Sequence, residues 1–209
     1  MSKTHIEKIT CPECDKIDEF VVWDSINTTK NPEMKEKCKK GELFRWTCPD
    51  CGCKVAVDFA TLYNDEENQV MVYYVPGNPE DMIPYVKHSL QDKSGKKRVV
   101  GSKNQFQEKI KIFEAGLDDK KIELMKLFAS TRVKLQDKGF ELSEMLFDKL
   151  SDGTECFALH LKNGKWQYME FDQALYQNVS KVFQGALEKD NEILIDFGWA
   201  VSVMQRQKR

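Results

Sequence analysis

The sequence predicts an α+β fold: a small N-terminal β-sheet with an inserted helix, followed by helices and a C-terminal α+β region. Three observations support this prediction. Short segments rich in β-branched and aromatic residues are spread through residues 4–75. Two patterns with helical spacing of apolar residues follow within residues 102–139. Asn163-Gly164, a strong hairpin signal, then separates two apolar segments near the end of the chain.

The composition narrows the class of protein. Of the 209 residues, 41% are hydrophobic and 32% are charged, as in globular proteins. The longest apolar runs, such as residues 70–75, are far shorter than the roughly 18–20 residues that a membrane span needs, so no membrane association is expected. The polar first ten residues do not resemble a signal peptide. A net charge of −2 argues against bulk attraction to nucleic acid or anionic lipid.

The most specific signal is a pair of Cys-Pro-x-Cys motifs, Cys11-Pro12-Glu13-Cys14 and Cys48-Pro49-Asp50-Cys51. Two intervening residues allow both sulfurs of a motif to reach one metal ion at about 2.3 Å. Seven cysteines, an odd number, indicate reduced thiols in a cytoplasmic protein rather than disulfides. We therefore expect one structural Zn²⁺ bound by Cys11, Cys14, Cys48 and Cys51. The alternative for the same residues is a pair of redox-active dithiols, that is, a thiol redox switch.

Residues 1–76 are predicted to form a zinc-ribbon-like sheet around these motifs. The order is strand, cysteine motif, strand, helix, strand, cysteine motif and hairpin. The helix is expected to begin at an Asn31 cap followed by Pro32 and to end at Gly41. Strands are expected at residues 4–10, 20–23, 43–47, 55–59 and 70–75, with a polar turn at 64–68. Cys38 and Cys53 are expected to be bystanders.

Residues 77–105 are predicted to be a basic linker region. Five of the eleven residues from 93 to 103 are basic: Lys93, Lys96, Lys97, Arg98 and Lys103. Such a cluster is compatible with phosphate contacts on nucleic acid. It is more typical of a solvated charged turn, as charged loops usually are.

Residues 106–209 are predicted to be an α+β region. One helix should follow a capping box at Ser102 and Gln105, and a second should begin at Asp118 and stop at Gly139. Asp172 should cap a further helix reaching about residue 188, and residues 193–204 should close the fold as a strand. Residues 142–150 are ambiguous between strand and helix. The aromatic residues Trp46, Trp166, Tyr168, Phe171 and Trp199 are expected in or near the core. The three histidines lie in no metal or triad motif, so no catalytic constellation is predicted.

The chain resembles the CpXC family, which is named for its two cysteine motifs. The resemblance includes Trp23-Asp24-Ser25-Ile26-Asn27, Gly41-Glu42-Leu43-Phe44 leading into Thr47-Cys48-Pro49, Glu108–Phe113 and Gly116–Asp119. It covers roughly residues 6–128 and implies a bacterial or archaeal protein with a four-cysteine zinc site. It implies no biochemical activity. Asp15 departs from the family pattern, in which glycine is more usual.

Three hypotheses for function remain. The first is a protein-interaction or adaptor module, and exposed apolar surface beside the ribbon would favour it. The second is a nucleic-acid binder that uses Lys93–Lys103. The third is an enzyme with a site in the C-terminal half, which a deep pocket with converging acid or base groups would support. A zinc ion with four thiolate ligands has no open position for water and is a poor hydrolytic centre.

Overall fold

The computed structural model describes residues 1–89, 95–136 and 141–207, and within them it is a mixed α+β protein, as predicted. The described residues form seven α-helices and ten strands in three sheets. The chain divides into two compact units, residues 1–110 (unit 1) and 111–209 (unit 2). The described part of the chain contains no helix that is long and apolar enough to cross a membrane.

Unit 1 contains a five-stranded sheet in the order β1-β2-β5-β6-β7 and a separate two-stranded ribbon, β3-β4. The strands are β1 (Lys3–Thr10), β2 (Ile17–Asn27), β3 (Arg45–Thr47), β4 (Lys54–Ala56), β5 (Thr61–Asp65), β6 (Val70–Tyr74) and β7 (Lys96–Val100). The helices are α1 (Glu33–Lys39), α2 (Ile83–Ser89), α3 (Lys103–Glu114) and two short 3₁₀ turns, η1 (Glu42–Phe44) and η2 (Pro79–Met82). β2 and β5 are parallel, as are β6 and β7, and the other pairs are antiparallel.

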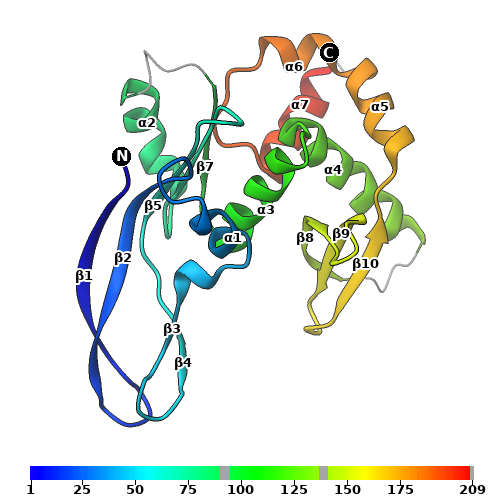
Figure 1. Cartoon of the computed structure of the whole chain (residues 1–209). Helices are drawn as coiled ribbons and strands as arrows, with labels where there is room; N and C mark the ends of the chain where they lie inside the picture. Colours follow the sequence, from blue (N-terminus) through cyan, green and yellow to red (C-terminus); the bar gives the residue numbers. More distant parts are fainter. Residues whose placement is uncertain (90–94, 137–140, 208–209) are drawn as a thin grey trace. The chain divides into compact units, whose positions relative to one another are not determined.

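Two hairpins carry the cysteine motifs at their tips (Figure 1). β1 and β2 pair up to Thr10 and Ile17, and the chain between these residues is the first cysteine turn. β3 and β4 pair up to Thr47 and Lys54, and the chain between them is the second. Strand pairing therefore brings the ends of each motif together. The tip of each hairpin is where the sequence supplies its two thiols.

An aromatic cluster fixes the base of the β3-β4 ribbon. The ring of Phe44, in η1, lies 5.1 Å from that of Phe59, 5.2 Å from that of Tyr74 and 5.8 Å from that of Phe106. Such pairs contribute about 0.5–1.5 kcal/mol each beyond their buried area. Tyr74 donates a hydrogen bond to Asp58, and the backbone N–H of residue 57 donates to the carbonyl of Phe44. The ribbon is thus held to the main sheet at the end opposite its cysteines.

Several features of unit 1 differ from the sequence predictions. β5 includes part of the expected polar turn at 64–68, because its buried Tyr63 and Asp65 place it inside the sheet. The α1 cap position is Pro32, without a side-chain hydrogen bond, so the Asn31 cap was wrong. The segment 77–105 contains η2, α2 and β7, and β7 pairs along its whole length with β6. The boundaries at residues 76 and 105 stay predictions.

Unit 2 is built on a three-stranded antiparallel sheet in the order β10-β9-β8. Its elements are α4 (Asp119–Gln136), β8 (Leu142–Lys149), β9 (Glu155–Leu161), β10 (Trp166–Glu170), α5 (Gln173–Val182), α6 (Gln184–Lys189) and α7 (Phe197–Gln207). The long helix α4 contacts α5, α7 and β8. At the start of α3, Ser102 Oγ accepts from the N–H of Gln105 as expected, but the Gln105 side chain accepts from the N–H of Gly101 rather than that of Ser102, so the capping box is only half formed. The Asp118 and Asp172 caps and the Asn163-Gly164 hairpin of unit 2 are present as expected.

Two predictions for unit 2 were wrong. The helix after Asp172 is interrupted at Phe183, whose buried ring packs against Phe128, and it resumes as α6. Residues 197–207 form a helix rather than part of a closing strand. Asp196 accepts a hydrogen bond from the backbone N–H of Trp199, and Trp199, Ala200 and Val203 share the buried face. The expected stop at Gly139 lies outside the described residues.

Trp166 and Tyr168 were also expected in or near the core, but they are 45% and 61% exposed. They lie two apart on β10, which is an edge strand, so both point to one face of the sheet. The ring of His160 stacks on that of Trp166 with centroids 4.5 Å apart. Trp46 and Trp199, by contrast, are buried as expected.

Candidate metal centre

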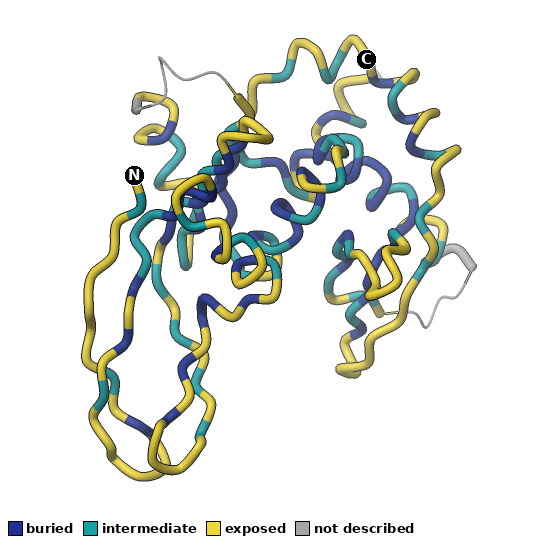
Figure 2. Tube along the Cα trace, viewed as in Figure 1, coloured by how far each residue is buried: buried dark blue, intermediate teal, exposed yellow. Residues whose placement is uncertain are grey.

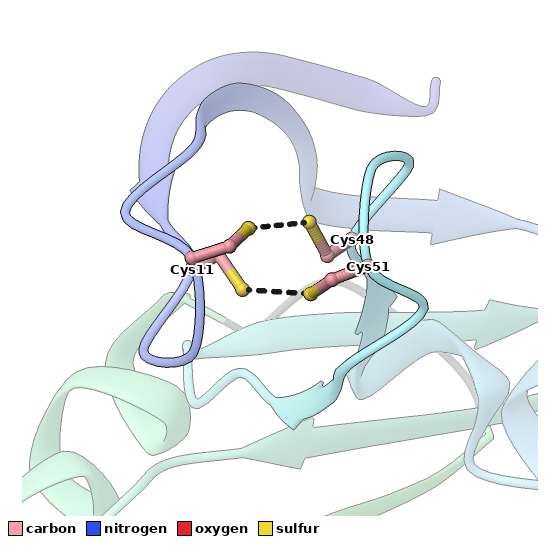
Figure 3. Close-up of side chains that lie close together, drawn as sticks. Cys11, Cys48 and Cys51 are labelled. Carbon is pink, nitrogen blue, oxygen red and sulfur yellow. Dashed lines mark hydrogen bonds between the residues drawn. The ribbon is translucent and has the colours of Figure 1, made fainter.

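The four sulfurs of the two cysteine motifs form one cluster. The Sγ atoms of Cys11, Cys14, Cys48 and Cys51 all lie within 4.8 Å of one another. The Cys11 and Cys51 sulfurs are 3.5 Å apart, and those of Cys14 and Cys48 are 3.6 Å apart (Figure 3). Four sulfurs placed tetrahedrally at about 2.3 Å from one zinc ion would be about 3.8 Å apart. The two printed separations are close to this value, so the cluster is compatible with a tetrahedral tetrathiolate site.

The two turns have the same backbone geometry. In the first, the N–H of Cys11 donates to the carbonyl of Lys16, and the N–H of Asp15 donates to the carbonyl of Cys11. In the second, Cys48 donates to Cys53 and Gly52 donates to Cys48 in the same pattern. Each turn closes on a residue with positive φ, 57° at Asp15 and 76° at Gly52. Only glycine adopts this conformation freely, so Asp15 is held there at some cost.

Burial alternates in the same way in both motifs. The first cysteine of each, Cys11 and Cys48, is buried, and the second, Cys14 and Cys51, is exposed. The buried pair packs on a small apolar cluster with Phe20, Val22 and Trp46. The indole Nε1–H of Trp46 donates to Asp18 Oδ2 at 3.1 Å, which joins the β3-β4 ribbon to β2. The cluster is small, so it depends on the cross-link that a metal would supply.

In this arrangement the Cys11 and Cys14 thiols differ in pKa. Burial raises the pKa of Cys11, but hydrogen bonds from the backbone N–H groups of Glu13 and Cys14 and from Cys51 lower it to about 7. The pKa of Cys14 is lowered by the N–H of Lys16, but hydrogen bonding with Cys51 and burial raise it to about 12. The Cys11 thiolate is therefore stabilised, whereas Cys14 keeps its proton more strongly. A divalent cation would replace the remaining protons, so metal binding should release them.

Comparison with known proteins assigns the chain to a family. The family model described as CpXC protein matches residues 9–126, more than half of the chain. The chain belongs to the CpXC family. The match includes both cysteine motifs and confirms the resemblance found in the sequence. Searches of curated proteins and of solved structures gave no significant match.

Three further thiols do not belong to this four-sulfur cluster, although that of Cys53 lies beside it, within hydrogen-bonding reach of Cys11. Cys53, two residues beyond Cys51, is half-buried and packs on the apolar cluster beneath the CpXC motifs. Cys38 is buried in α1, where burial raises its pKa to about 12. Cys156 is buried in β9 of unit 2, where burial raises its pKa. A buried thiol with a raised pKa is a poor ligand and a poor nucleophile.

The basic residues predicted to contact nucleic acid are not gathered on one exposed surface. Lys93 lies outside the described residues. Arg98 is buried in β7 and donates to the carbonyl of Lys97. Lys103 forms an ion pair with Asp58, with Nζ and Oδ1 3.3 Å apart, and Lys96 is exposed. The involvement of these residues in nucleic-acid binding stays a prediction.

An exposed apolar surface on the β1-β2 hairpin, beside the candidate metal centre, was not predicted from the sequence. Ile6, Ile17 and Val21 are apolar side chains on the β1-β2 hairpin that are between 48% and 61% exposed. Ile6 and Val21 are directly paired, and Ile17 lies four residues before Val21 on the same strand. The period-two geometry of strands therefore places all three on one face. Figure 2 shows that most of this hairpin is exposed.

Proposed function

We propose that the chain is a zinc-binding adaptor of the bacterial cytoplasm, in which a structural Zn²⁺ bound by Cys11, Cys14, Cys48 and Cys51 presents the β1-β2 hairpin to another protein. The observation that supports the metal is the four-sulfur cluster, with separations close to those of a tetrahedral tetrathiolate. Zinc fits four reduced cysteines better than calcium or magnesium, which prefer oxygen ligands. Reduced thiols are in turn maintained in the cytoplasm.

The zinc would be structural rather than catalytic. With four protein sulfurs bound, a tetrahedral zinc ion has no position for water or substrate. Its contribution is to cross-link the tips of two hairpins that otherwise rest on a small apolar cluster. Structural zinc sites contribute roughly 10–16 kcal/mol of apparent binding energy, which would offset the ordering of both turns.

Cobalt substitution tests the coordination. Co²⁺ in a tetrahedral tetrathiolate site gives strong ligand-field absorption together with sulfur-to-cobalt charge transfer. We expect this spectrum in the wild-type chain and its replacement on addition of one equivalent of Zn²⁺. Cys51→Ser should change the spectrum, whereas Cys53→Ser should leave it unaltered. An octahedral cobalt spectrum would contradict the proposed site.

The support for a protein partner is the surface of the β1-β2 hairpin. β1 is the edge strand of the five-stranded sheet, so one side of its backbone is unpaired with any described strand. Seven of its eight residues are exposed. Exposed strand edges with apolar side chains on one face recruit an extended segment of another chain as an added strand. The partner we propose is such a segment, with apolar side chains over Ile6 and Val21.

Site-specific photo-cross-linking tests this surface in cells that express the full chain. A photoreactive residue at position 6 should give a discrete adduct, and Val21→Asp should abolish it. The control position is Tyr85, which is 69% exposed in α2. With the purified partner, amide exchange should slow at alternate residues of β1, since only every second N–H faces an added strand. Equal labelling at positions 6 and 85, or no change in exchange along β1, would contradict the proposal.

Two alternatives are distinguishable from this function. A nucleic-acid binder would show affinity that falls steeply with salt and with neutralisation of Lys96 and Lys97. A thiol redox switch would lose its metal when Cys11, Cys14, Cys48 and Cys51 are oxidised in pairs. The gathering of all four sulfurs within 4.8 Å of one another, rather than in two separate pairs, favours the structural site over the switch.

A further inference from the structure

Unit 2 contains a cavity of about 710 Å³ that belongs to neither cysteine motif. It lies between the second half of α4, the strands β9 and β10, and the beginning of α5. The lining residues on α4 include Met125, Ala129 and Val133, which recur at a spacing of four. This spacing places them on one helical face. The cavity is therefore part of the packing between a helix and a sheet.

The lining changes in character from the floor to the rim. Met125, Ala129 and Phe157 are buried and form an apolar floor. Further apolar residues, all half-buried, form the walls: Phe128, Val133, Met169, Phe171 and Leu175. The exposed members of the lining are all polar or charged, and they include Arg132 and Glu170. The cavity thus has an apolar interior and a polar entrance.

The size of this space requires an explanation. Protein interiors are packed about as densely as organic crystals, and few voids exceed the size of a water molecule. This space is partly open to solvent, and water against its apolar lining would find few polar partners. A volume of 710 Å³ lies within the range of about 300–1,000 Å³ that is typical of small-molecule sites. Two of its lining residues are methionines, which adapt readily to the shape of a ligand.

The charges at the entrance indicate which polar group the ligand carries. The guanidinium of Arg132 makes no hydrogen bond or ion pair with any residue that the structure describes, and it is exposed. Of the two carboxylates in the lining, that of Asp172 caps α5 by accepting from the N–H of Leu175 at 2.9 Å. The other carboxylate, that of Glu170 on β10, is exposed. A guanidinium group pairs well with a carboxylate, because it can donate two parallel hydrogen bonds to the two carboxylate oxygens.

We infer that this cavity binds a small amphiphilic carboxylic acid, with its acyl chain or ring on the Met125, Ala129 and Phe157 floor and its carboxylate on Arg132. The site requires neither the metal nor the hairpin surface. It therefore adds a ligand-binding function to the C-terminal unit, whatever partner the N-terminal unit has. Glu170 would disfavour a second negative charge on the ligand, so a monocarboxylate is the expected class.

Calorimetric titration of the full, zinc-loaded chain with decanoate tests the inference. We expect saturable binding of one decanoate per chain, with decanol and decylamine binding more weakly. Because Arg132 is exposed, Arg132→Gln should leave the fold intact and weaken decanoate binding by about tenfold or more, the usual effect of losing a charge-assisted hydrogen bond. Glu170→Gln is the matched control and should keep or strengthen the binding of decanoate.

A second pair of variants tests the apolar floor. Ala129→Leu places extra carbon atoms in the cavity and should weaken decanoate binding by at least tenfold. Ala174→Leu adds the same atoms at an exposed position of α5 outside the lining and should have no effect. Failure of decanoate to saturate, tighter binding of decylamine, or binding insensitive to both Arg132→Gln and Ala129→Leu would each overturn the inference. A circular dichroism spectrum of each variant establishes that it is folded.

Discussion

Replacing Gly52 by alanine is expected to weaken metal binding about fivefold, although the new methyl group would touch nothing. A Cβ built at Gly52 has no atom of the chain within 4 Å, so the substitution causes no steric clash. The effect comes from the backbone, because Gly52 has a φ of 76° and closes the second cysteine turn. Its N–H donates to the carbonyl of Cys48, so the turn cannot relax without losing that hydrogen bond.

The magnitude follows from two opposing contributions. A side chain in the left-handed region costs about 1–2 kcal/mol. Alanine also reduces the conformational freedom of the unfolded chain, which stabilises the folded state by about 0.4–1 kcal/mol. The net penalty is about 1 kcal/mol, which corresponds to about a fivefold rise in the dissociation constant of zinc. Asp15 has the same conformation, with φ of 57°, but aspartate tolerates it. Asp15→Gly should therefore change zinc affinity by less than about twofold.

Competition with a chromogenic chelator measures both dissociation constants. Gly185→Ala is the control, since Gly185 lies in α6 without positive φ and a Cβ there meets no atom within 4 Å. It should not alter zinc affinity. The reasoning would be refuted if Gly52→Ala bound zinc as tightly as the wild type, or if Asp15→Gly weakened binding as much as Gly52→Ala does.

The remaining predictions concern the ligands and a buried carboxylate of unit 2. Cys51→Ser should lower bound zinc well below one per chain, whereas Cys53→Ser should retain it, as measured by atomic emission. Asp190→Ala should destabilise unit 2 by about 3 kcal/mol, because the Asp190 side chain is 3% exposed and pairs with Lys120 at 3.2 Å and Trp199 Nε1 at 3.1 Å. Urea unfolding followed by fluorescence measures this loss of stability. A loss under 1 kcal/mol would contradict the prediction. Burial raises the pKa of Asp190, but hydrogen bonds from Trp199 and the backbone of Glu192, with the charge of Lys120, lower it below its usual value. The contribution of Asp190 to stability is therefore complete above the unfolded pKa of about 3.9 and is lost as the pH falls through the lower folded pKa. Asp190→Asn should make unfolding less dependent on acid. An unchanged acid transition would contradict this role of Asp190.

The four-cysteine cluster was predictable from sequence because its determinants are local. Two Cys-Pro-x-Cys turns fix the ligand type, number and spacing within a few residues of each other. The caps at Asp118 and Asp172 and the Asn163-Gly164 hairpin were predictable for the same reason. In each case a short side chain or a turn dipeptide decides the structure without help from distant residues.

The wrong predictions arose where distant contacts decide the outcome. Residues 193–204 contain enough β-branched and aromatic residues for a strand, but the Asp196 cap and the burial of Trp199 and Val203 on one face make residues 197–207 a helix. Trp166 and Tyr168 were assigned to the core by residue type alone. Their exposure follows from the position of β10 at the edge of its sheet, which no local pattern reveals.

The apolar hairpin surface and the cavity were missed for a related reason. Ile6, Ile17 and Val21 alternate as inward-facing residues would, and only the strand order shows that β1 is an edge strand. The cavity depends on the packing of α4 against β10 and α5, and the lining residues of α4 are more than 30 positions from those of β10 and α5. The helical spacing of apolar residues within 102–139 predicted the helix but could not predict a pocket beside it.

The most direct test of the central claim is the metal content of protein purified without added metal, with reactive thiols counted before and after chelation. The account predicts one zinc per chain. It also predicts that Cys11, Cys14, Cys48 and Cys51 become reactive together when a chelator removes the metal, as the two hairpin tips separate. Protein without zinc, in which these four cysteines are oxidised in pairs, would contradict the structural site and favour the redox switch.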